Sequence, residues 1–314
     1  MSKKSITFAR FCVIWFENNT SKMRKRDYIF GIVTILLVVG LLVMLIYNMC
    51  HIISERHTVQ LNGVSISYLV KGRVQGKPVL LLHGNGGSHE DLKVMTDQLA
   101  AAGYLVWAPD SRGQGANPPL NEYHYIDMAE DMHQFVEQVI APYYGPSQSP
   151  AIAFYRRVTQ FATSVISGNG KTNTEHFQPV VFGWSDGGII ALQTEVKYPG
   201  TWAALVTSGA NIDPDCGAWD LAEQRAHPAD TSALYQMMLY EPNMTAEDMR
   251  HIQCPALIVA GENDLISREH THLIGDNIPQ GEVLIVPHAD HGSHIFNNPE
   301  MGNIMLGYLN QINY

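Results

Sequence analysis

A serine inside a glycine-rich turn is the first residue whose surroundings suggest chemistry. Residues 183–188 read Gly-Trp-Ser-Asp-Gly-Gly, directly after the apolar run VVF and before a stretch with helical character. A serine in a sharp strand-to-helix turn exposes its hydroxyl above the sheet. Small residues two positions before and after it let the backbone close. Ser185 is therefore the candidate nucleophile.

A serine hydroxyl attacks well only when a base takes its proton, and a carboxylate must orient that base. Asp264 follows an apolar run in GENDLIS, and His291 follows the last such run in PHADHGSH. Sites of open α/β sheets gather at the carboxyl ends of the strands. We predict Asp264 as the acid and His291 as the base, in the chain order serine, acid, histidine. Alternatives within reach are Glu262 or Asp213 for the acid and His288 or His294 for the base.

The segment 288–294 also contains side chains that bind metals, namely two further histidines and Asp290 around His291. Its position after the last expected strand is the position that a hydrolase needs for its base. We therefore expect no metal and no organic cofactor.

Stabilisation of an oxyanion needs backbone N–H groups, and a glycine-rich turn lets them approach. The turn His83-Gly84-Asn85-Gly86-Gly87 closes an apolar run, so we assign the first N–H to Asn85 and the second to Asp186. The Asp186 side chain has two open interpretations: it favours the helix macrodipole, or it binds an ammonium group of a substrate. We interpret residues 110–115 (DSRGQG) as a structural turn with a network of aspartate–arginine hydrogen bonds.

Apolar runs of strand length alternate with helical stretches from residue 58 onward, which is typical of a mostly parallel sheet with helices on both faces. Asn62-Gly63 predicts a hairpin between HTVQL and VSISYLV. The expected buried strands are 78–82, 104–109, 179–184, 203–210, 255–261 and 283–287. One helix is expected to begin near Ser88, whose hydroxyl can cap it. Further helices are expected at 126–141, 187–198 and 264–276.

Two connections are longer than such a sheet requires. An insertion at 141–178 precedes the strand that leads to Ser185, and residues 211–254 contain short helical pieces. Either segment is a candidate cover for a pocket.

The N-terminal residues differ in composition from the rest. Residues 1–27 carry seven basic and two acidic residues, and no Asp, Glu, Lys or Arg occurs from Tyr28 to Ser54. Roughly 20 apolar residues suffice to cross the ~30 Å hydrocarbon layer. We predict a cytoplasmic tail at 1–27, a membrane-spanning signal-anchor helix at 28–53 and, from the positive-inside bias, an extracytoplasmic domain at 57–314 in the cell membrane.

Charge and cysteine content exclude other classes of function. Residues 57–314 carry 12 basic residues against 27 acidic ones, so this part repels phosphate backbones and we expect no nucleic acid as a partner. The four cysteines form no CxxC pair, which argues against a zinc knuckle or a disulfide framework.

Together, HGNGG, DSRGQG, GWSDGG, GENDLIS and His291 make residues 58–314 resemble the α/β-hydrolase-fold serine hydrolases. The segments GWSDGGIIAL, KYP, SGAN and IQCPALIVAGEND are most similar to the biphenyl-hydrolase-like (valacyclovir hydrolase) esterases. This resemblance implies that the triad Ser185, His291 and Asp264 cleaves small-molecule carboxylic esters, including amino-acid esters, through an acyl-enzyme. Serine at the turn argues against epoxide hydrolase and haloalkane dehalogenase chemistry. An amidase or peptidase, a C–C hydrolase, an acyltransferase and a non-catalytic adhesion or receptor domain remain alternatives.

Overall fold

The computed structural model describes residues 25–50, 52–145 and 178–314. The chain divides into two compact units, Met1–Cys50 and His51–Tyr314. In the first unit, α2 (Lys25–Cys50) is a helix of 26 residues. Among the residues that the structure describes fully, no helix combines the length and the hydropathy that crossing a membrane requires. The helix expected at 28–53 is present as Lys25–Cys50, whereas Ile52 and Ile53 form the start of β1, and its membrane crossing stays a prediction.

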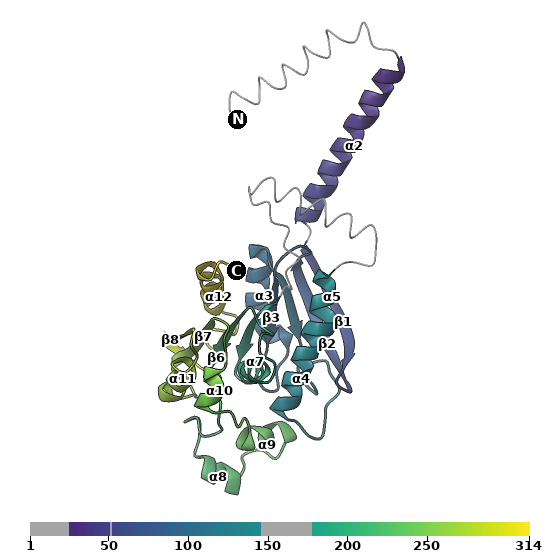
Figure 1. Cartoon of the computed structure of the whole chain (residues 1–314). Helices are drawn as coiled ribbons and strands as arrows, with labels where there is room; N and C mark the ends of the chain where they lie inside the picture. Colours follow the sequence, from purple (N-terminus) through teal and green to yellow (C-terminus); the bar gives the residue numbers. More distant parts are fainter. Residues whose placement is uncertain (1–24, 51, 146–177) are drawn as a thin grey trace. The chain divides into compact units, whose positions relative to one another are not determined.

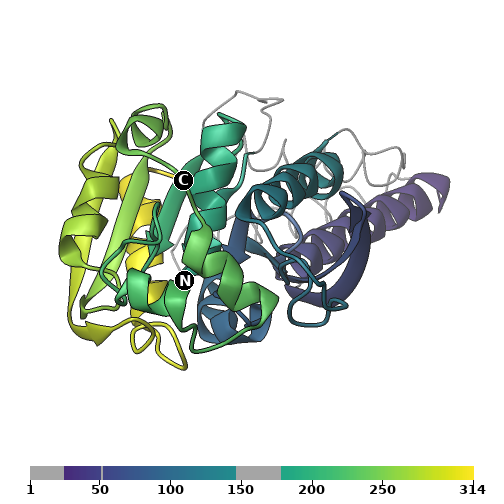
Figure 2. The ribbon, with the colours of Figure 1, turned by 90° about the horizontal axis from the view of Figure 1, so that it is seen from below.

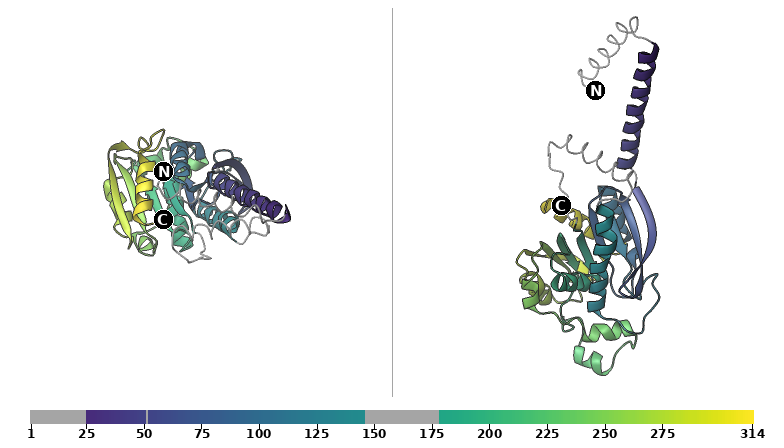
Figure 3. Two further views of the ribbon diagram at one scale, coloured as in Figure 1. Left: turned by 90° about the horizontal axis from the view of Figure 1, so that it is seen from above. Right: turned by 45° about the vertical axis from the view of Figure 1, so that its right-hand side comes forward.

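The second unit is built on an eight-stranded sheet with the order β1-β2-β4-β3-β5-β6-β7-β8 (Figure 1). The hairpin strands β1 and β2 run antiparallel to each other, β2 runs antiparallel to β4, and the remaining neighbours are parallel. Figure 3 shows this hairpin at one edge of the sheet. The strands are β1 (Ile52–Leu61), β2 (Val64–Arg73), β3 (Pro78–Leu82), β4 (Leu105–Pro109), β5 (Val180–Trp184), β6 (Ala204–Ser208), β7 (Ala256–Asn263) and β8 (Gly281–Asp290).

Helices cover both faces of this sheet, and α4 and α7 lie on the face opposite to α3 and α12 (Figure 2). In Figure 1, α8 and α9 lie at the lower end of the sheet. The helices are α3 (Lys93–Ala102), α4 (Tyr125–Phe135), α5 (Ala141–Tyr144), α7 (Asp186–Lys197), α8 (Leu221–Ala226), α9 (Ala233–Tyr240), α10 (Ala246–Arg250), α11 (Arg268–Gly275) and α12 (Glu300–Gln311), with a 3-10 turn η1 (His89–Leu92) and a π-helical turn η2 (Val136–Ile140).

The sheet separates two hydrophobic cores, because successive side chains of a strand point to opposite faces. In β3, Leu80 and Leu82 pack into the core beneath α4 and α7, whereas Val79 and Leu81 pack into the core beneath α3 and α12. Strands buried on both faces need apolar residues at every position, which explains the continuous apolar runs of the sequence.

The predicted strands and the Asn62-Gly63 hairpin are confirmed, with differences at several ends. The hairpin begins at Ile52 rather than near residue 57, since its pairing extends to Ile52 opposite Arg73. Helix α11 begins at Arg268 rather than at 264, because β7 continues to Asn263 and Ser267 caps the helix. Helix α12 was not expected. Of the predicted insertion at 141–178, residues 146–177 lie outside the described residues.

The turn at 110–115 is structural, but Arg112 does not pair with the aspartate of the same turn, Asp110. Arg112 makes two hydrogen bonds to Asp131 of α4, at 2.7 and 2.6 Å. Asp110 instead accepts hydrogen bonds from the backbone of His89 and Ala116. The aspartate–arginine network therefore ties the turn to α4, a contact that sequence proximity does not reveal.

We expect Asp131→Asn to lower the free energy of unfolding by about 3 kcal/mol, because it leaves the buried guanidinium of Arg112 with only the half-exposed carboxylate of Asp127, at 3.3 Å, as its counter-charge. Urea denaturation measures this change. Glu247→Gln is the control, since it breaks the exposed Arg250–Glu247 pair and is expected to cost about 1 kcal/mol or less. Equal losses in the two variants would contradict the structural role given to Asp131.

Candidate active site

Ser185 lies in a tight turn between β5 and α7, with φ 53° and ψ −120°. Its backbone N–H donates to the carbonyl of Ser208 on the neighbouring strand at 2.8 Å. A Cβ at Gly183 would lie 2.2 Å from the carbonyl oxygen of Gly187, and one at Gly187 would lie 2.2 Å from that of Leu82. The turn therefore closes only because both positions are glycine.

His291 and Asp264 meet Ser185 at the end of the sheet where β5, β7 and β8 finish. The His291 Nε2 atom lies 3.0 Å from the Ser185 Oγ atom, and its Nδ1 atom lies 2.6 Å from Asp264 Oδ1. An ionised carboxylate only accepts hydrogen bonds, so Nδ1 carries the proton and Nε2 is free to accept one from the serine. The geometry is that of a nucleophile, a base and an orienting acid.

Asp264 is held in the ionised state. Burial alone would raise the pKa of its carboxyl group, but the hydrogen bond and the charge of His291 and the backbone N–H groups of Gly261 and Ile266 outweigh burial and lower it. Those N–H groups donate at 3.0 and 3.1 Å. The backbone of its own loop therefore holds the Asp264 carboxylate in place, in addition to its bond with His291.

Trp184 connects the serine turn with the histidine loop. Its indole N–H donates to the backbone carbonyl of His291 at 2.8 Å. Its ring packs edge-to-face against Phe296, with ring centroids 4.6 Å apart. The residue next to the nucleophile therefore holds the loop that carries the base, which the sequence motif alone does not indicate.

The alternative acids and bases lie in other environments. His288 is almost fully exposed, and its backbone N–H donates to Glu262. His294 is fully buried, and its Nε2 atom lies 2.8 Å from Ser208 Oγ. Asp213 accepts from the backbone N–H of Asp215 in an exposed loop. Within the described residues, no group of three or more His, Cys, Asp or Glu residues is arranged to hold a metal ion.

The two residues expected to form the oxyanion hole lie next to each other. The Asn85 side chain donates from Nδ2 to Asp186 Oδ2 at 2.8 Å, which joins the glycine-rich turn after β3 to the first residue of α7. The next residue of that turn, Gly86, donates its N–H to Gln114 Oε1 at 2.7 Å. Gln114 is a supporting residue that sequence reasoning missed, since no local pattern links positions 86 and 114.

The Asp186 carboxyl group is buried, although it lies beside the nucleophile. Burial raises its pKa to about 6, against the hydrogen bond from Asn85, the contact with Tyr125 and the nearby His291, which all lower it. The Tyr125 hydroxyl reaches this carboxyl group without a hydrogen bond of regular geometry. Around neutral pH, the buried carboxylate is ionised, and this lowers the stability of the folded protein.

Comparison with known proteins decides the family. The sequence model described as "Alpha/beta hydrolase family" matches residues 79–239, which is about half of the chain. The chain belongs to the alpha/beta hydrolase family. It is an enzyme of this fold, and its relatives include a serine hydrolase and a monoacylglycerol lipase. The resemblance seen in the sequence motifs is thereby confirmed.

This α/β hydrolase is similar to one human and one bacterial protein. It is 27% identical over 266 residues to the serine hydrolase BPHL of Homo sapiens, covering 76% of this chain and 80% of the human protein. It is also 27% identical over 243 residues to a thermostable monoacylglycerol lipase of Bacillus sp. (strain H-257), covering 74% and 87%. A solved structure, a thermophilic esterase from Thermogutta terrifontis, shares the fold with a TM-score of 0.57 at 19% identity, covering 83% of this chain and 100% of the esterase.

The buried Asp186 predicts a pH dependence of stability. Its ordinary pKa is 3.8 and its folded pKa is about 6, so the folded state binds more protons between about pH 4 and 6. The contribution of Asp186 to the free energy of unfolding therefore falls as pH rises through this window and is level above it. The total contribution is about 3 kcal/mol as an order of magnitude.

Asp186→Asn keeps an acceptor for Asn85 and removes the titration, so we expect the variant to gain stability over the native chain as pH rises from 4 to 7. Urea denaturation at a series of pH values measures the difference between the two proteins. Asp276→Asn, at an exposed position, serves as the control. A difference that does not change with pH would rule out this account of Asp186.

Proposed function

We propose that the protein hydrolyses carboxylic esters of small molecules through an acyl-enzyme, with Ser185 as nucleophile, His291 as general base and acid, and Asp264 as the orienting acid. The observation that carries this proposal is the continuous hydrogen-bond path from Ser185 Oγ through both nitrogens of His291 to Asp264. Family membership supports it independently, because a serine hydrolase and a monoacylglycerol lipase, which cleaves an ester, occur among the relatives.

In the first step, Ser185 Oγ forms a bond to the ester carbonyl carbon while its proton passes to His291 Nε2. The carbonyl oxygen becomes an oxyanion, which the backbone N–H groups of Asn85 and Asp186 stabilise. The C–O bond to the alcohol then breaks, and the alcohol leaves with the proton from His291. Water repeats the sequence on the acyl-enzyme, with His291 again as the base, and releases the acid.

The substrate contact predicted for Asp186 stays a prediction. Its carboxyl group already accepts from Asn85, and an ammonium group of a substrate would have to reach a side chain with 3% of its surface exposed. Kinetics with an aminoacyl ester and its N-acetylated counterpart distinguish the cases. A preference for the free amine that Asp186→Asn removes supports the contact, and equal rates refute it.

We also propose that α2 anchors the protein in the cell membrane as a single-pass helix, with the N-terminus in the cytoplasm and the hydrolase domain outside it. Large apolar side chains of α2, among them Phe30, Leu36 and Leu37, are exposed. At 1.5 Å per residue, its 26 residues give a length of about 39 Å, more than the ~30 Å hydrocarbon layer. The basic residues that precede the apolar run favour this orientation.

Substitution of the triad tests the catalytic proposal with short p-nitrophenyl esters as substrates. We expect Ser185→Ala and His291→Ala to remove nearly all hydrolysis, and Asp264→Asn to lower kcat by about 10³- to 10⁴-fold through loss of the correct histidine tautomer. His294→Gln, which alters a buried histidine outside the triad, is the matched control and retains more activity than His291→Ala. Full activity in Ser185→Ala would refute the mechanism.

Alkaline extraction of membranes tests the anchor. We expect the full chain to remain in the membrane pellet, and a variant with Leu37→Asp and Val38→Asp to be released, because charged groups at mid-helix cost about 3 kcal/mol each in a bilayer. Protease added to intact cells should digest the hydrolase domain. Release of the native chain by alkali would refute the anchor, and protection of an anchored domain from protease would refute its orientation.

A further inference from the structure

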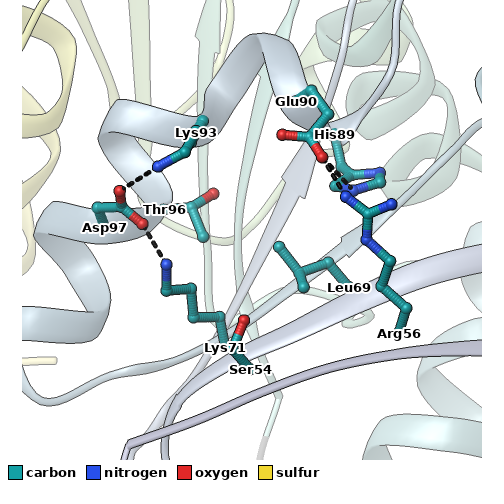
Figure 4. A pocket seen from close by; sticks show the side chains of 9 residues that line it. All are labelled: Ser54, Arg56, Leu69, Lys71, His89, Glu90, Lys93, Thr96 and Asp97. Atoms are coloured by element: carbon teal, nitrogen blue, oxygen red, sulfur yellow. Dashed lines mark hydrogen bonds and ion pairs between the residues drawn. The ribbon is translucent and has the colours of Figure 1, made fainter.

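A cavity of about 320 Å³ lies away from Ser185, between the β1–β2 hairpin and the segment η1–α3. Ser54 and Arg56 of β1 are paired with Lys71 and Leu69 of β2, so these alternate positions place four side chains on one face of the hairpin. The opposite wall comes from one side of η1 and α3, where a spacing of three and four residues aligns the side chains. These are His89, Glu90, Lys93, Thr96 and Asp97 (Figure 4).

Basic side chains outnumber acidic ones around this cavity. Both Lys71 and Lys93 donate to Asp97, at 2.5 and 2.7 Å, and Arg56 pairs with Glu90. The lining thus carries three positive and two negative charges, in a domain that otherwise has a large excess of acidic residues. An ammonium group has three donors, so each lysine retains hydrogen-bonding capacity beyond its bond to Asp97.

Two buried polar atoms of the lining have no hydrogen-bond partner among the described residues. The first is the hydroxyl oxygen of Thr96, a residue that is 1% exposed, and the second is Nε2 of His89, which is 6% exposed. A buried polar group without a partner costs about 1–3 kcal/mol. Both residues line the cavity, so a ligand there can provide the missing partners.

The hydrogen bond at Nδ1 of His89 determines whether Nε2 donates or accepts a hydrogen bond. His89 Nδ1 lies 2.7 Å from Asp110 Oδ1. Burial alone would raise the pKa of Asp110, but hydrogen bonds from His89 and Ala116 lower it, so this carboxylate is ionised and accepts the Nδ1 proton. In the neutral ring, Nε2 therefore carries a lone pair. Glu90 Oε1 lies 3.5 Å from Nε2 and pairs with it only when the ring carries a second proton; the carboxylate cannot donate a hydrogen bond to the neutral ring (Figure 4).

We propose that this cavity binds a phosphate group that retains a P–O–H, as inorganic phosphate does and as a phosphomonoester does in its monoanionic form. The anionic oxygens accept from Lys71, Lys93 and the Thr96 hydroxyl, and the P–O–H donates to His89 Nε2. A sulfate or a phosphodiester matches the charge of the lysines but has no hydrogen to donate. The site therefore selects inorganic phosphate and the monoanion of a phosphomonoester group, whether that group belongs to a soluble metabolite or to a lipid.

Isothermal titration calorimetry at about pH 6, on the full chain in an uncharged detergent, tests this proposal, because phosphomonoesters retain a P–O–H near that pH. The Ser185→Ala background prevents turnover of any ester in the probe. Inorganic phosphate is expected to bind at one saturable site per chain, with sulfate and dihexanoyl phosphatidylcholine at least about tenfold weaker, as one lost hydrogen bond to a buried group implies. Absence of saturable phosphate binding, or equal affinity for sulfate, would overturn the proposal.

Charge variants separate this site from general electrostatic attraction. Lys93→Met and Thr96→Val should each weaken phosphate binding by about three- to tenfold, and Asp97→Asn should tighten it by a similar factor, because a competing carboxylate is removed. Lys197 and Glu130 form a second lysine–carboxylate pair in the same domain. Lys197→Met and Glu130→Gln are therefore matched controls, and effects as large as those of Lys93→Met and Asp97→Asn would overturn the assignment.

The same titration distinguishes the two sources of the phosphate group. If dihexanoyl phosphatidic acid binds more tightly than glycerol 3-phosphate and competes with inorganic phosphate, the site binds a lipid headgroup. Equal affinities of these two probes assign it to a soluble phosphomonoester. If Lys93→Met leaves the binding of both probes unchanged, they bind elsewhere and the proposal fails.

Discussion

The backbone of Ser185 has a φ of 53°, a conformation that a residue with a side chain adopts at a cost of about 1–3 kcal/mol. Its surroundings maintain it: the N–H is bonded to β6, and the carbonyl accepts from Gly188 and Ile189 in α7. Glycines at 183 and 187 allow these backbones to approach. The position of the candidate nucleophile thus depends on close contact between β5, β6 and α7, and only then on the side chains around it.

Two buried carboxyl groups near this turn are driven in opposite directions by their surroundings. Hydrogen bonds and the charge of His291 lower the pKa of Asp264, whereas burial raises that of Asp186. The difference lies in the donors that each receives, since backbone N–H groups face Asp264 and Asp186 faces mainly side chains. One carboxylate is therefore available as a charged partner for the histidine, and the other joins the Asn85 turn to α7 at a cost in stability.

The turn after β4 supports both the expected oxyanion hole and the proposed phosphate cavity. Gln114 holds the backbone of Gly86 beside the expected oxyanion hole. Asp110 holds both the backbone and the ring of His89 at the proposed phosphate cavity. Since Gly86 and His89 are three residues apart, ligand binding at the cavity and geometry at the oxyanion turn share one support. Arg112 attaches that support to α4 through Asp131.

The sheet, the hairpin and the approach of Ser185, Asp264 and His291 could all be predicted from the sequence, because parallel strands bring their carboxyl ends to one edge. Contacts between elements remote in the chain show which of the competing histidines and acids lie near the serine: His294 points into the core toward Ser208, and Glu262 points outward. The same contacts show the partner of Arg112 and the unpaired atoms in the cavity between the β1–β2 hairpin and α3. Periodicity specifies which face a side chain takes, whereas hydrogen-bond partners depend on distances between elements that are remote in the chain.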